Sequence, residues 1–171
     1  MRGGERQPGV LDIARTQATY LRLFLNRTNM SAEARLYTFS QETKDKLRKF
    51  RLGTSRAKDP QAIIYQIDRK TYEIVPEDDQ VYTNMQELAD ELPDHAPRFI
   101  LLSYPLELAS GRLSVPYVML YYLPVTTKQD VRMTYAGAKE LMRNTSEVGK
   151  IIDIETAEEL ENIEEKLKSE A

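Results

Sequence analysis

The sequence predicts one α/β (α+β) layered domain, with a central mixed sheet of about five strands flanked by helices. Two long apolar runs, "RFILLSYPL" (98–106) and "LSVPYVMLYYL" (113–123), are the first observation. They are nearly continuous rather than alternating, which is typical of strands that helices cover on both faces. The second observation is that capped amphipathic segments separate these runs from shorter β-rich segments. Together they predict the element order α-β-β-α-β-β-α-β-α.

The first predicted elements are a helix and a pair of strands. Ser40 is expected to cap a helix that ends at about Leu52, because Gly53 would stop it. The segments "AIIYQI" (62–67) and "YEIV" (72–75) have strand composition and lie on either side of the turn "DRK".

The three later helices are predicted from capping motifs. Each begins at a threonine followed three residues later by a polar or acidic residue, so that two side chains can bond the first backbone N–H groups. The pairs are Thr83 with Gln86, Thr127 with Asp130, and Thr156 with Glu159. Pro93 is expected to end the first of these helices. The last helix is expected to bury the ridge formed by Ala157, Leu160, Ile163 and Leu167.

Turn and strand signals complete the second half of the domain. Ser110 and Gly111 supply turn chemistry for a hairpin between the two long apolar runs. Pro116 is expected near a strand start, a bulge or a sheet edge. The segment "VGKIIDI" (148–154) predicts one further strand.

Patterns that carry catalysis or bind metals are scarce. The single histidine, His95, lies in the loop "LPDHAPRF", where a solvated or locally bonded residue is favoured over a base. The acidic stretch "PEDDQ" (76–80) lacks the spacing of a calcium loop and is interpreted as a solvated turn. Cysteine is absent and no phosphate-binding glycine loop is present. We therefore expect no enzyme, no cofactor and no metal, with a small hydrolase using His95 as an alternative.

The charge distribution is strongly asymmetric. Residues 1–58 carry 13 Lys/Arg and 5 Asp/Glu, whereas residues 151–171 carry 2 and 8. This pattern predicts an oriented polar contact with a partner or, equally, two solvated faces. No run approaches the ~18 apolar residues of a membrane span. Five cations surround the apolar residues of the first helix and fit a protein contact or a solvated face better than nucleic acid: Lys44, Lys46, Arg48, Lys49 and Arg51.

The helix predicted around "RMTYAGAKELMRN" (132–144) has an unusual outer face. At 100° per residue its buried stripe consists of Val131, Tyr135, Ala138 and Met142. Met133 then points outward, with Gly137 on a flank. A flexible apolar side chain beside small residues suggests a face that docks into a groove. The alternative is that Met133 is a scattered exposed residue and that Gly137 lies under a loop.

The first 29 residues differ in kind from the remainder. "MRGGERQPGV" has the composition of a disordered leader. We interpret residues 1–29 as a leader or a gene-model extension, Met30 as the natural start, and 30–171 as the domain. Residues 1–29 also resemble a mitochondrial transit peptide, because they contain five arginines, but their lack of serine argues against that interpretation.

Four segments resemble the glia maturation factor family, particularly its fungal members. They are "KLRKFR" (46–51), "ELPDHAPRFILLSY" (91–104), "GRLSVPY" (111–117) and "MTYAGAKELMRNT" (133–145). The likeness runs from about Ser31 to Lys168. It implies the actin-depolymerising-factor homology fold, which is similar to that of cofilin.

The resemblance implies a non-catalytic regulator of branched actin. Members of the family bind the actin-related protein 2/3 complex, mainly its actin-related protein 2 subunit, inhibit nucleation and promote debranching. The implied protein is a monomer that binds actin itself weakly and has neither a nucleic-acid nor a membrane partner. Its implied location is the cytoplasm, at the cortical actin cytoskeleton, with the nucleus as a second compartment.

The resemblance also implies which residues bind the partner. The groove-binding helix is 127–143, in which Arg132, Met133, Gly137 and Lys139 match the family pattern. A second implied surface combines acidic residues of 155–165 with five other positions: Arg48, Lys49, Arg51, Gly111 and Arg112. Ser31 is the implied regulatory site, where a phosphate would add nearly two negative charges to a packed contact.

The alternative within the same fold is a cofilin-type protein that binds actin monomers or filaments and severs them. Asp130 argues against it, since it stands where a cofilin would favour lysine.

Overall fold

The computed structural model describes residues 36–169 of the 171-residue chain. The predicted leader (1–29), the predicted domain start at Met30 and the regulatory candidate Ser31 lie outside the described residues. Within residues 36–169, every helix is too short or too polar to cross a bilayer.

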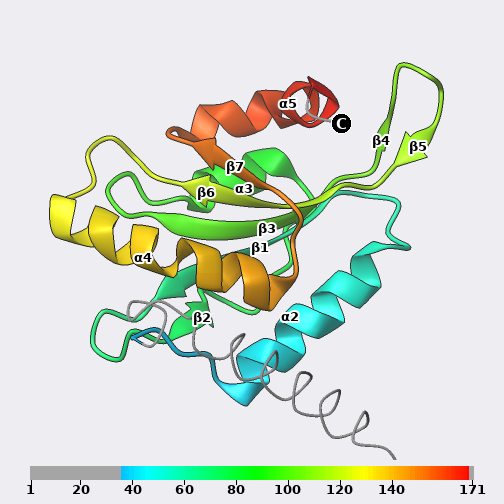
Figure 1. The fold of residues 1–171 in the computed structure, drawn as a ribbon. Coiled ribbons are helices and arrows are strands. Elements are labelled where there is room, and N and C mark those ends of the chain that lie inside the picture. Colours follow the sequence, from blue (N-terminus) through cyan, green and yellow to red (C-terminus); the bar gives the residue numbers. More distant parts are fainter. Residues whose placement is uncertain (1–35, 170–171) are drawn as a thin grey trace, which may run out of the picture. The chain divides into compact units, whose positions relative to one another are not determined.

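Five strands form the central sheet in the order β2-β1-β3-β6-β7 (Figure 1). Their bounds are β1 (Gln61–Ile67), β2 (Ile74–Pro76), β3 (Arg98–Ser103), β6 (Tyr117–Tyr122) and β7 (Ile151–Ile154). Neighbouring strands run antiparallel, except that β7 is parallel to β6. A parallel pair needs a crossover connection, and a long helix supplies it here. The predicted mixed five-stranded sheet is confirmed.

The middle of the sheet is covered on both faces. Every residue of β3 is buried, and so is most of β6, which confirms the interpretation of the apolar runs for these two strands. It is wrong for the start of the second run, because Leu113 and Val115 are exposed and Leu113 belongs to a separate short hairpin strand. The strand register places Tyr65 beside Phe99, and Phe99 beside Tyr121, in one row across the sheet. Ile64 and Ile100 form a corresponding pair on the opposite face.

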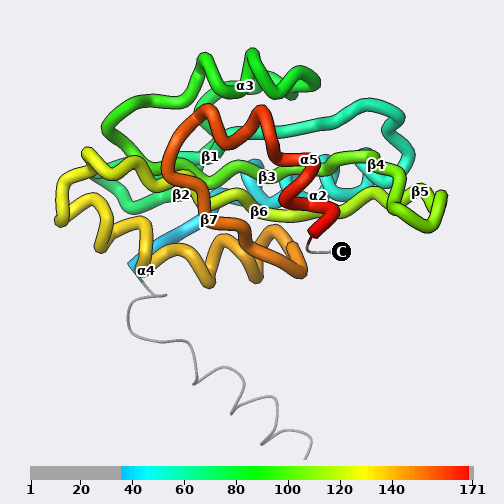
Figure 2. Tube along the Cα trace, turned by 90° about the horizontal axis from the view of Figure 1, so that it is seen from above, coloured from blue at the N-terminus to red at the C-terminus, as the bar shows by residue number. Residues whose placement is uncertain are grey.

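Helices form a layer on each side of the sheet (Figures 1 and 2). The helices α2 (Gln41–Thr54) and α4 (Gln129–Ser146) pack on the face that carries Phe99. The opposite face is covered by α3 (Met85–Glu91), the 3₁₀ helix η2 (Ala157–Asn162) and α5 (Ile163–Ser169).

The start of α2 is predicted correctly, but its end is not. The Thr43 N–H donates to the Ser40 hydroxyl oxygen at 3.1 Å, so Ser40 is the expected cap. The helix continues through Gly53 to Thr54, and the predicted stop at Gly53 is wrong. The reason is that Ser55 ends the helix in a right-handed conformation, so no left-handed glycine is needed.

Two predicted caps are also wrong. Asn84, not Thr83, begins α3, because its side-chain oxygen accepts the Gln86 N–H at 2.8 Å. Lys128 is the residue before α4, and it makes no side-chain capping bond. The Thr127 N–H donates to the Pro124 carbonyl at 3.0 Å, so Thr127 belongs to a preceding turn that buries it. The helix that is predicted to bind the partner therefore spans 129–146 rather than 127–143.

The third predicted cap is confirmed. Thr156 and Glu159 form a reciprocal capping box, which opens η2 and leads directly into α5. Glu159 also pairs with Lys166. Of the predicted ridge, Leu160, Ile163 and Leu167 are buried and Ala157 is partly buried.

A small hairpin extends from the end of the sheet (Figure 1). It consists of β4 (Leu106–Glu107) and β5 (Leu113–Ser114). Gly111 adopts φ +77°, which favours glycine and confirms the predicted turn. Pro116 lies directly before β6, as expected for a residue that cannot donate to a strand ladder.

Candidate functional site

The helix α4 buries one side and exposes the other, with the predicted phase. Of the predicted stripe, Tyr135, Ala138 and Met142 are buried and Val131 is half-buried, whereas Met133 is 66 % exposed. The Ile67 N–H donates to the Tyr135 hydroxyl oxygen at 3.0 Å, which ties the helix to the end of β1. Because the backbone of α4 is anchored this way, the outer face is presented by a fixed helix.

The space beside Gly137 is filled by the protein itself. An ideal Cβ at Gly137 would lie 2.8 Å from the hydroxyl oxygen of Tyr37, closer than real Cβ atoms approach. That hydroxyl donates to the Thr134 carbonyl of α4 at 2.6 Å. The sequence prediction attributes this glycine to the close approach of a partner. The structure gives another reason, because Tyr37 of the same domain occupies the space beside it. A contact between Gly137 and a partner stays a prediction.

Two cations predicted to bind the partner hold α4 in place. Lys139 pairs with Asp153 of β7 at 2.7 Å, and its ammonium lies 4.4 Å from the centre of the Tyr121 ring. Arg132 donates to the Pro124 carbonyl at 3.3 Å. Both side chains therefore connect α4 to the sheet and to the loop before the helix.

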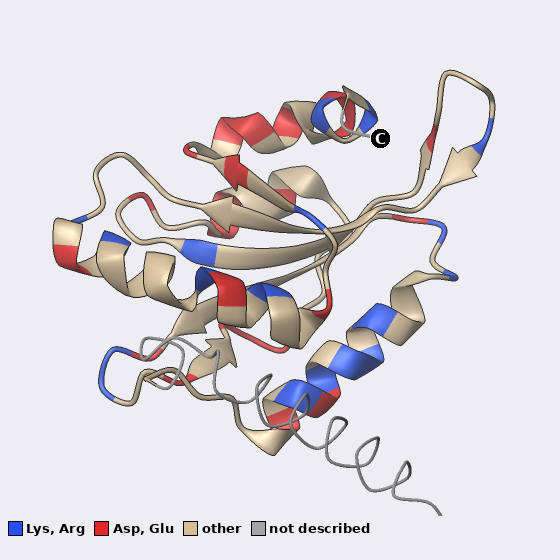
Figure 3. Cartoon of the chain, in the orientation of Figure 1, with Lys and Arg blue, Asp and Glu red and all other residues tan. Residues whose placement is uncertain are grey.

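The predicted second surface is divided among three elements. Arg48 and Lys49 are exposed on α2 and form no ion pair within residues 36–169, whereas Arg51 pairs with Glu147 at 2.5 Å. Gly111 and Arg112 are exposed at the hairpin tip. Figure 3 shows the cations along α2 and the acidic residues along η2 and α5. The sheet separates α2 from η2 and α5, so the structure does not bring the acids of 155–165 next to these cations.

The interpretation of the acidic stretch 76–80 as a solvated turn holds for Asp78, Asp79 and Gln80, which are exposed, but is wrong for Glu77. Glu77 pairs with Arg98 at 2.7 Å, and the exposed fractions of these two side chains are only 25 % and 11 %. Asp79 pairs with Lys46 of α2 at 2.6 Å, and Asp78 accepts a bond from the Tyr82 hydroxyl at 2.7 Å. The two ion pairs join residues that lie 21 and 33 positions apart, so no local sequence signal reveals them.

Arg98 stays charged although it lies in the sheet. Burial by itself lowers the pKa of Arg98, but the bidentate contact with Glu77, together with the nearby Tyr135 hydroxyl, outweighs it and raises the pKa above the usual value. The Arg98 guanidinium also donates to the Pro97 carbonyl at 2.8 Å. The pair fastens the segment after β2 to the start of β3.

His95 is a locally bonded residue. Its Nδ1 lies 3.0 Å from the Thr126 hydroxyl, which in turn donates to the Asp94 carbonyl at 2.6 Å. The contact joins two exposed loops. Residues 36–169 contain no group of three or more acidic or histidine side chains placed to hold a metal ion.

Comparison with known proteins connects this arrangement to actin. A family model described as cofilin/tropomyosin-type actin-binding protein matches residues 36–168. Protein AIM7 of Saccharomyces cerevisiae is 33% identical over 144 residues, which cover 78% of this chain and 94% of the yeast protein. Human glia maturation factor beta is 36% identical over 123 residues, which cover 71% of this chain and 84% of the human protein.

Solved structures agree with these relatives. The solution structure of glia maturation factor from Caenorhabditis elegans superimposes with a TM-score of 0.61 at 32% identity, covering 72% of this chain and 88% of that one. Streptomyces griseoflavus cofilin superimposes with a TM-score of 0.63 at 20% identity, covering 78% and 98%, and shows the shared fold. The chain therefore belongs to the glia maturation factor family of actin-related regulators, within the cofilin/tropomyosin-type actin-binding proteins.

Proposed function

We propose that this protein binds the actin-related protein 2/3 complex through α4, inhibits branched actin nucleation and promotes debranching. Family membership supports a non-enzymatic regulator of this kind. The observation that carries the proposal is Met133, which is 66 % exposed on an otherwise anchored helix. Moving a flexible apolar side chain from water into an apolar groove lowers the free energy, which favours binding.

The anchoring of α4 supports the same proposal. Tyr135, Arg132 and Lys139 fix the helix to the sheet and to the preceding loop. A surface that is already ordered loses little conformational entropy on binding. We assign Arg132 and Lys139 to positioning the helix, and Met133 to the contact.

A second contact through α2 and the hairpin is part of the proposal. Arg48 and Lys49 suit an acidic partner surface, because both are exposed and neither has an ion-pair partner in the described part of the chain. Gly111 and Arg112 would extend this contact from the hairpin tip. Such rim charges contribute mainly to association rate and orientation.

The test of function is imaging of branched actin filaments in the presence of the full chain. We expect branches to dissociate while mother filaments keep their length. Shortening of unbranched filaments would instead support the cofilin-type alternative. Branches that persist at saturating protein would contradict the proposal.

The residue-level prediction concerns Met133. Met133→Asp is expected to weaken binding to the complex at least tenfold, because it replaces the apolar contact by a charge that must be desolvated. Met133→Leu is the matched control and should keep most of the affinity. Both variants should unfold at the temperature of the unaltered protein, since residue 133 is exposed. Equal binding by the Asp and Leu variants would exclude Met133 from the contact.

Regulation and location remain predictions carried by the resemblance. Ser31 is proposed as a phosphorylation site that weakens binding by electrostatic repulsion, which a Ser31→Asp variant in the binding assay would test. The proposed location is the cortical actin cytoskeleton and, secondarily, the nucleus.

A further inference from the structure

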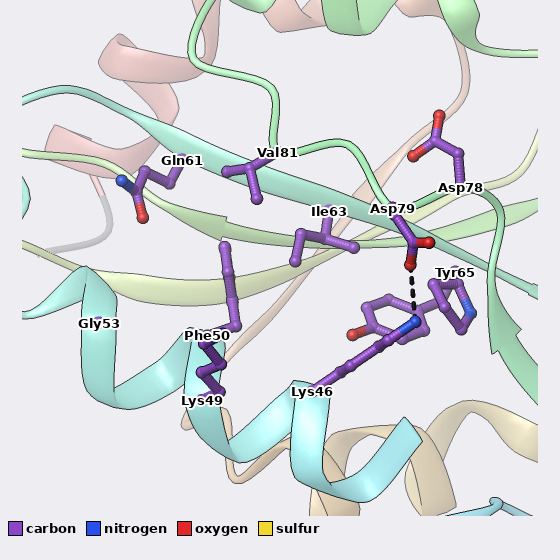
Figure 4. Close-up of a pocket in the computed structure, with 11 residues that line it drawn as sticks. Lys46, Lys49, Phe50, Gly53, Gln61, Ile63, Tyr65, Asp78, Asp79 and Val81 are labelled. Atoms are coloured by element: carbon purple, nitrogen blue, oxygen red, sulfur yellow. Dashed lines mark hydrogen bonds and ion pairs between the residues drawn. The ribbon is translucent and has the colours of Figure 1, made fainter. Parts of the chain in front are cut away.

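A pocket of about 300 Å³ lies between α2 and the sheet, away from α4. Phe50 and Gly53 of α2 form one wall, and Ile63 and Tyr65 of β1 form the other (Figure 4). The segment after β2 forms the third side with Asp78, Asp79 and Val81. Its size is at the lower end of ligand pockets, and its walls combine apolar side chains with few polar groups, as such pockets do.

A buried hydroxyl without a partner belongs to this wall. Tyr65 is 0 % exposed, and its hydroxyl makes no hydrogen bond to any residue in the described range. Figure 4 shows its ring reaching from β1 toward α2 beside Lys46, with the hydroxyl on the side of Phe50. Most buried polar groups are paired, so an unpaired one at a pocket wall is a donor available to a ligand.

Gly53 leaves the pocket open at the end of α2, across the pocket from Tyr65 (Figure 4). An ideal Cβ at Gly53 would meet no atom within 4 Å, so nothing in the packing of α2 requires a glycine there. Glycine also disfavours helix relative to alanine. A larger side chain at this position would occupy space at the pocket wall. The residue thus keeps the pocket accessible at some cost to the helix.

The charges at the rim balance. Lys46 and Lys49 come from α2, and Asp78 and Asp79 lie opposite them in the segment after β2. Lys46 and Asp79 are joined across the pocket by their 2.6 Å ion pair (Figure 4). With equal numbers of cations and anions, the rim favours an uncharged occupant over an ion of either sign.

We infer that this pocket binds an uncharged aromatic molecule of one or two rings that carries a hydrogen-bond acceptor. The rings lie between Phe50 and Ile63, and the acceptor receives the hydrogen bond of the Tyr65 hydroxyl. The site contains no residue of α4 and shares only Lys49 with the proposed partner surface.

The test is a titration of the ¹⁵N-labelled full chain followed by NMR chemical shifts. Quinoline is the probe, because it is neutral at pH 7 and has one ring nitrogen that accepts a hydrogen bond. Naphthalene is its counterpart of the same shape without an acceptor. We expect quinoline to cause saturable shifts of amides around Phe50, Gly53, Ile63 and Val81. Naphthalene should bind about 3- to 10-fold more weakly, because it leaves Tyr65 unpaired.

Two variants separate the contributions of space and hydrogen bonding. Gly53→Leu fills the opening and should weaken quinoline binding at least tenfold. Gly149→Leu is the matched control, since Gly149 also has no atom within 4 Å of an ideal Cβ but lies outside the pocket. Tyr65→Phe should reduce the difference between quinoline and naphthalene to less than twofold.

The inference is overturned if quinoline causes no saturable shifts up to its solubility limit. It is also overturned if quinoline and naphthalene bind the unaltered chain equally, or if Gly53→Leu binds quinoline as the unaltered chain does. None of these results depends on debranching activity, so failure here and failure of the proposed function are distinguishable.

Discussion

Two helix glycines of this protein have opposite surroundings. Gly137 of α4 faces the hydroxyl of Tyr37, which occupies the place that a side chain would take. Gly53 of α2 faces open space at the edge of a pocket. A glycine in a helix can therefore have different structural reasons. Packing inside the domain requires Gly137, whereas it does not require Gly53.

Tyr37 beside Gly137 and Tyr65 in the wall of the pocket show a similar contrast. The Tyr37 hydroxyl donates to a carbonyl of α4 at 2.6 Å and so fastens the segment before α2 to that helix. The Tyr65 hydroxyl is buried without a hydrogen bond among the described residues. One hydroxyl stabilises the domain, and the other is a polar group whose desolvation is not offset.

Gly137→Ala is expected to have the largest effect on stability. Alanine favours the helix by about 1 kcal/mol, but the new methyl group displaces the buried Tyr37 ring and breaks its hydrogen bond. We expect a net loss of about 1–2 kcal/mol, measured by urea denaturation followed by circular dichroism.

The Tyr37→Phe background tests this explanation. Without the hydroxyl, the alanine methyl group has more room, so Gly137→Ala should cost clearly less there than in the unaltered chain. The two substitutions would then show a coupling energy of at least about 0.5 kcal/mol, as expected for residues in contact. Strict additivity would disprove the contact as the cause.

Gly53→Ala should have a smaller effect of the opposite sign. The residue is helical and the space is open, so alanine should stabilise the domain by about 0.5–1 kcal/mol. The same denaturation experiment provides the measurement, and Gly137→Ala is its matched counterpart. A loss of stability would mean that Gly53 is constrained by packing after all.

Tyr65→Phe should have the smallest effect at pH 7. Removal of an unpaired buried hydroxyl is expected to leave stability unchanged or to raise it by up to about 0.5 kcal/mol, because its desolvation cost disappears, whereas Tyr37→Phe should cost about 1 kcal/mol. A large loss on Tyr65→Phe would show that its hydroxyl is paired in solution.

The same variant has a pH signature. Burial raises the pKa of Tyr65 to about 12, against about 10 in an unfolded chain. The unfolded state therefore loses this proton first, so the stability that the neutral group contributes is complete below pH 10 and is lost as the pH rises toward 12. By pH 11, Tyr65→Phe should gain about 1 kcal/mol relative to the unaltered chain. Parallel stability curves between pH 9 and 11 would contradict this.

The fold was predictable because its signals are local. The uninterrupted apolar run of β3 predicted a strand buried on both faces, and the spacing of Thr156 and Glu159 predicted a capping box. The predicted caps at Thr83 and Thr127 are wrong for two different reasons. Asn84 offers an equivalent cap one residue after Thr83. Thr127 is held in a turn from Pro124, so α4 begins after Lys128 without a side-chain cap.

The candidate site was predictable only in part. The 3.6-residue period of the helix placed Met133 outward, and the structure agrees. The same pattern could not show that Tyr37 occupies the space beside Gly137, because those residues are 100 positions apart in the chain. Nor could it show that Lys139 is held by Asp153, or that Glu77 and Asp79 pair with Arg98 and Lys46.

The sequence by itself determined which segments become strands and helices and which side of α4 faces water, because hydrophobic periodicity and capping act over a few residues. The tertiary structure alone decided what lies beside each glycine and which charges are paired, because these contacts join residues far apart in the chain. Gly53 and Gly137 illustrate this, since both are glycines in amphipathic helices. Only the packed domain shows that Tyr37 fills the space beside Gly137, whereas the space beside Gly53 is empty.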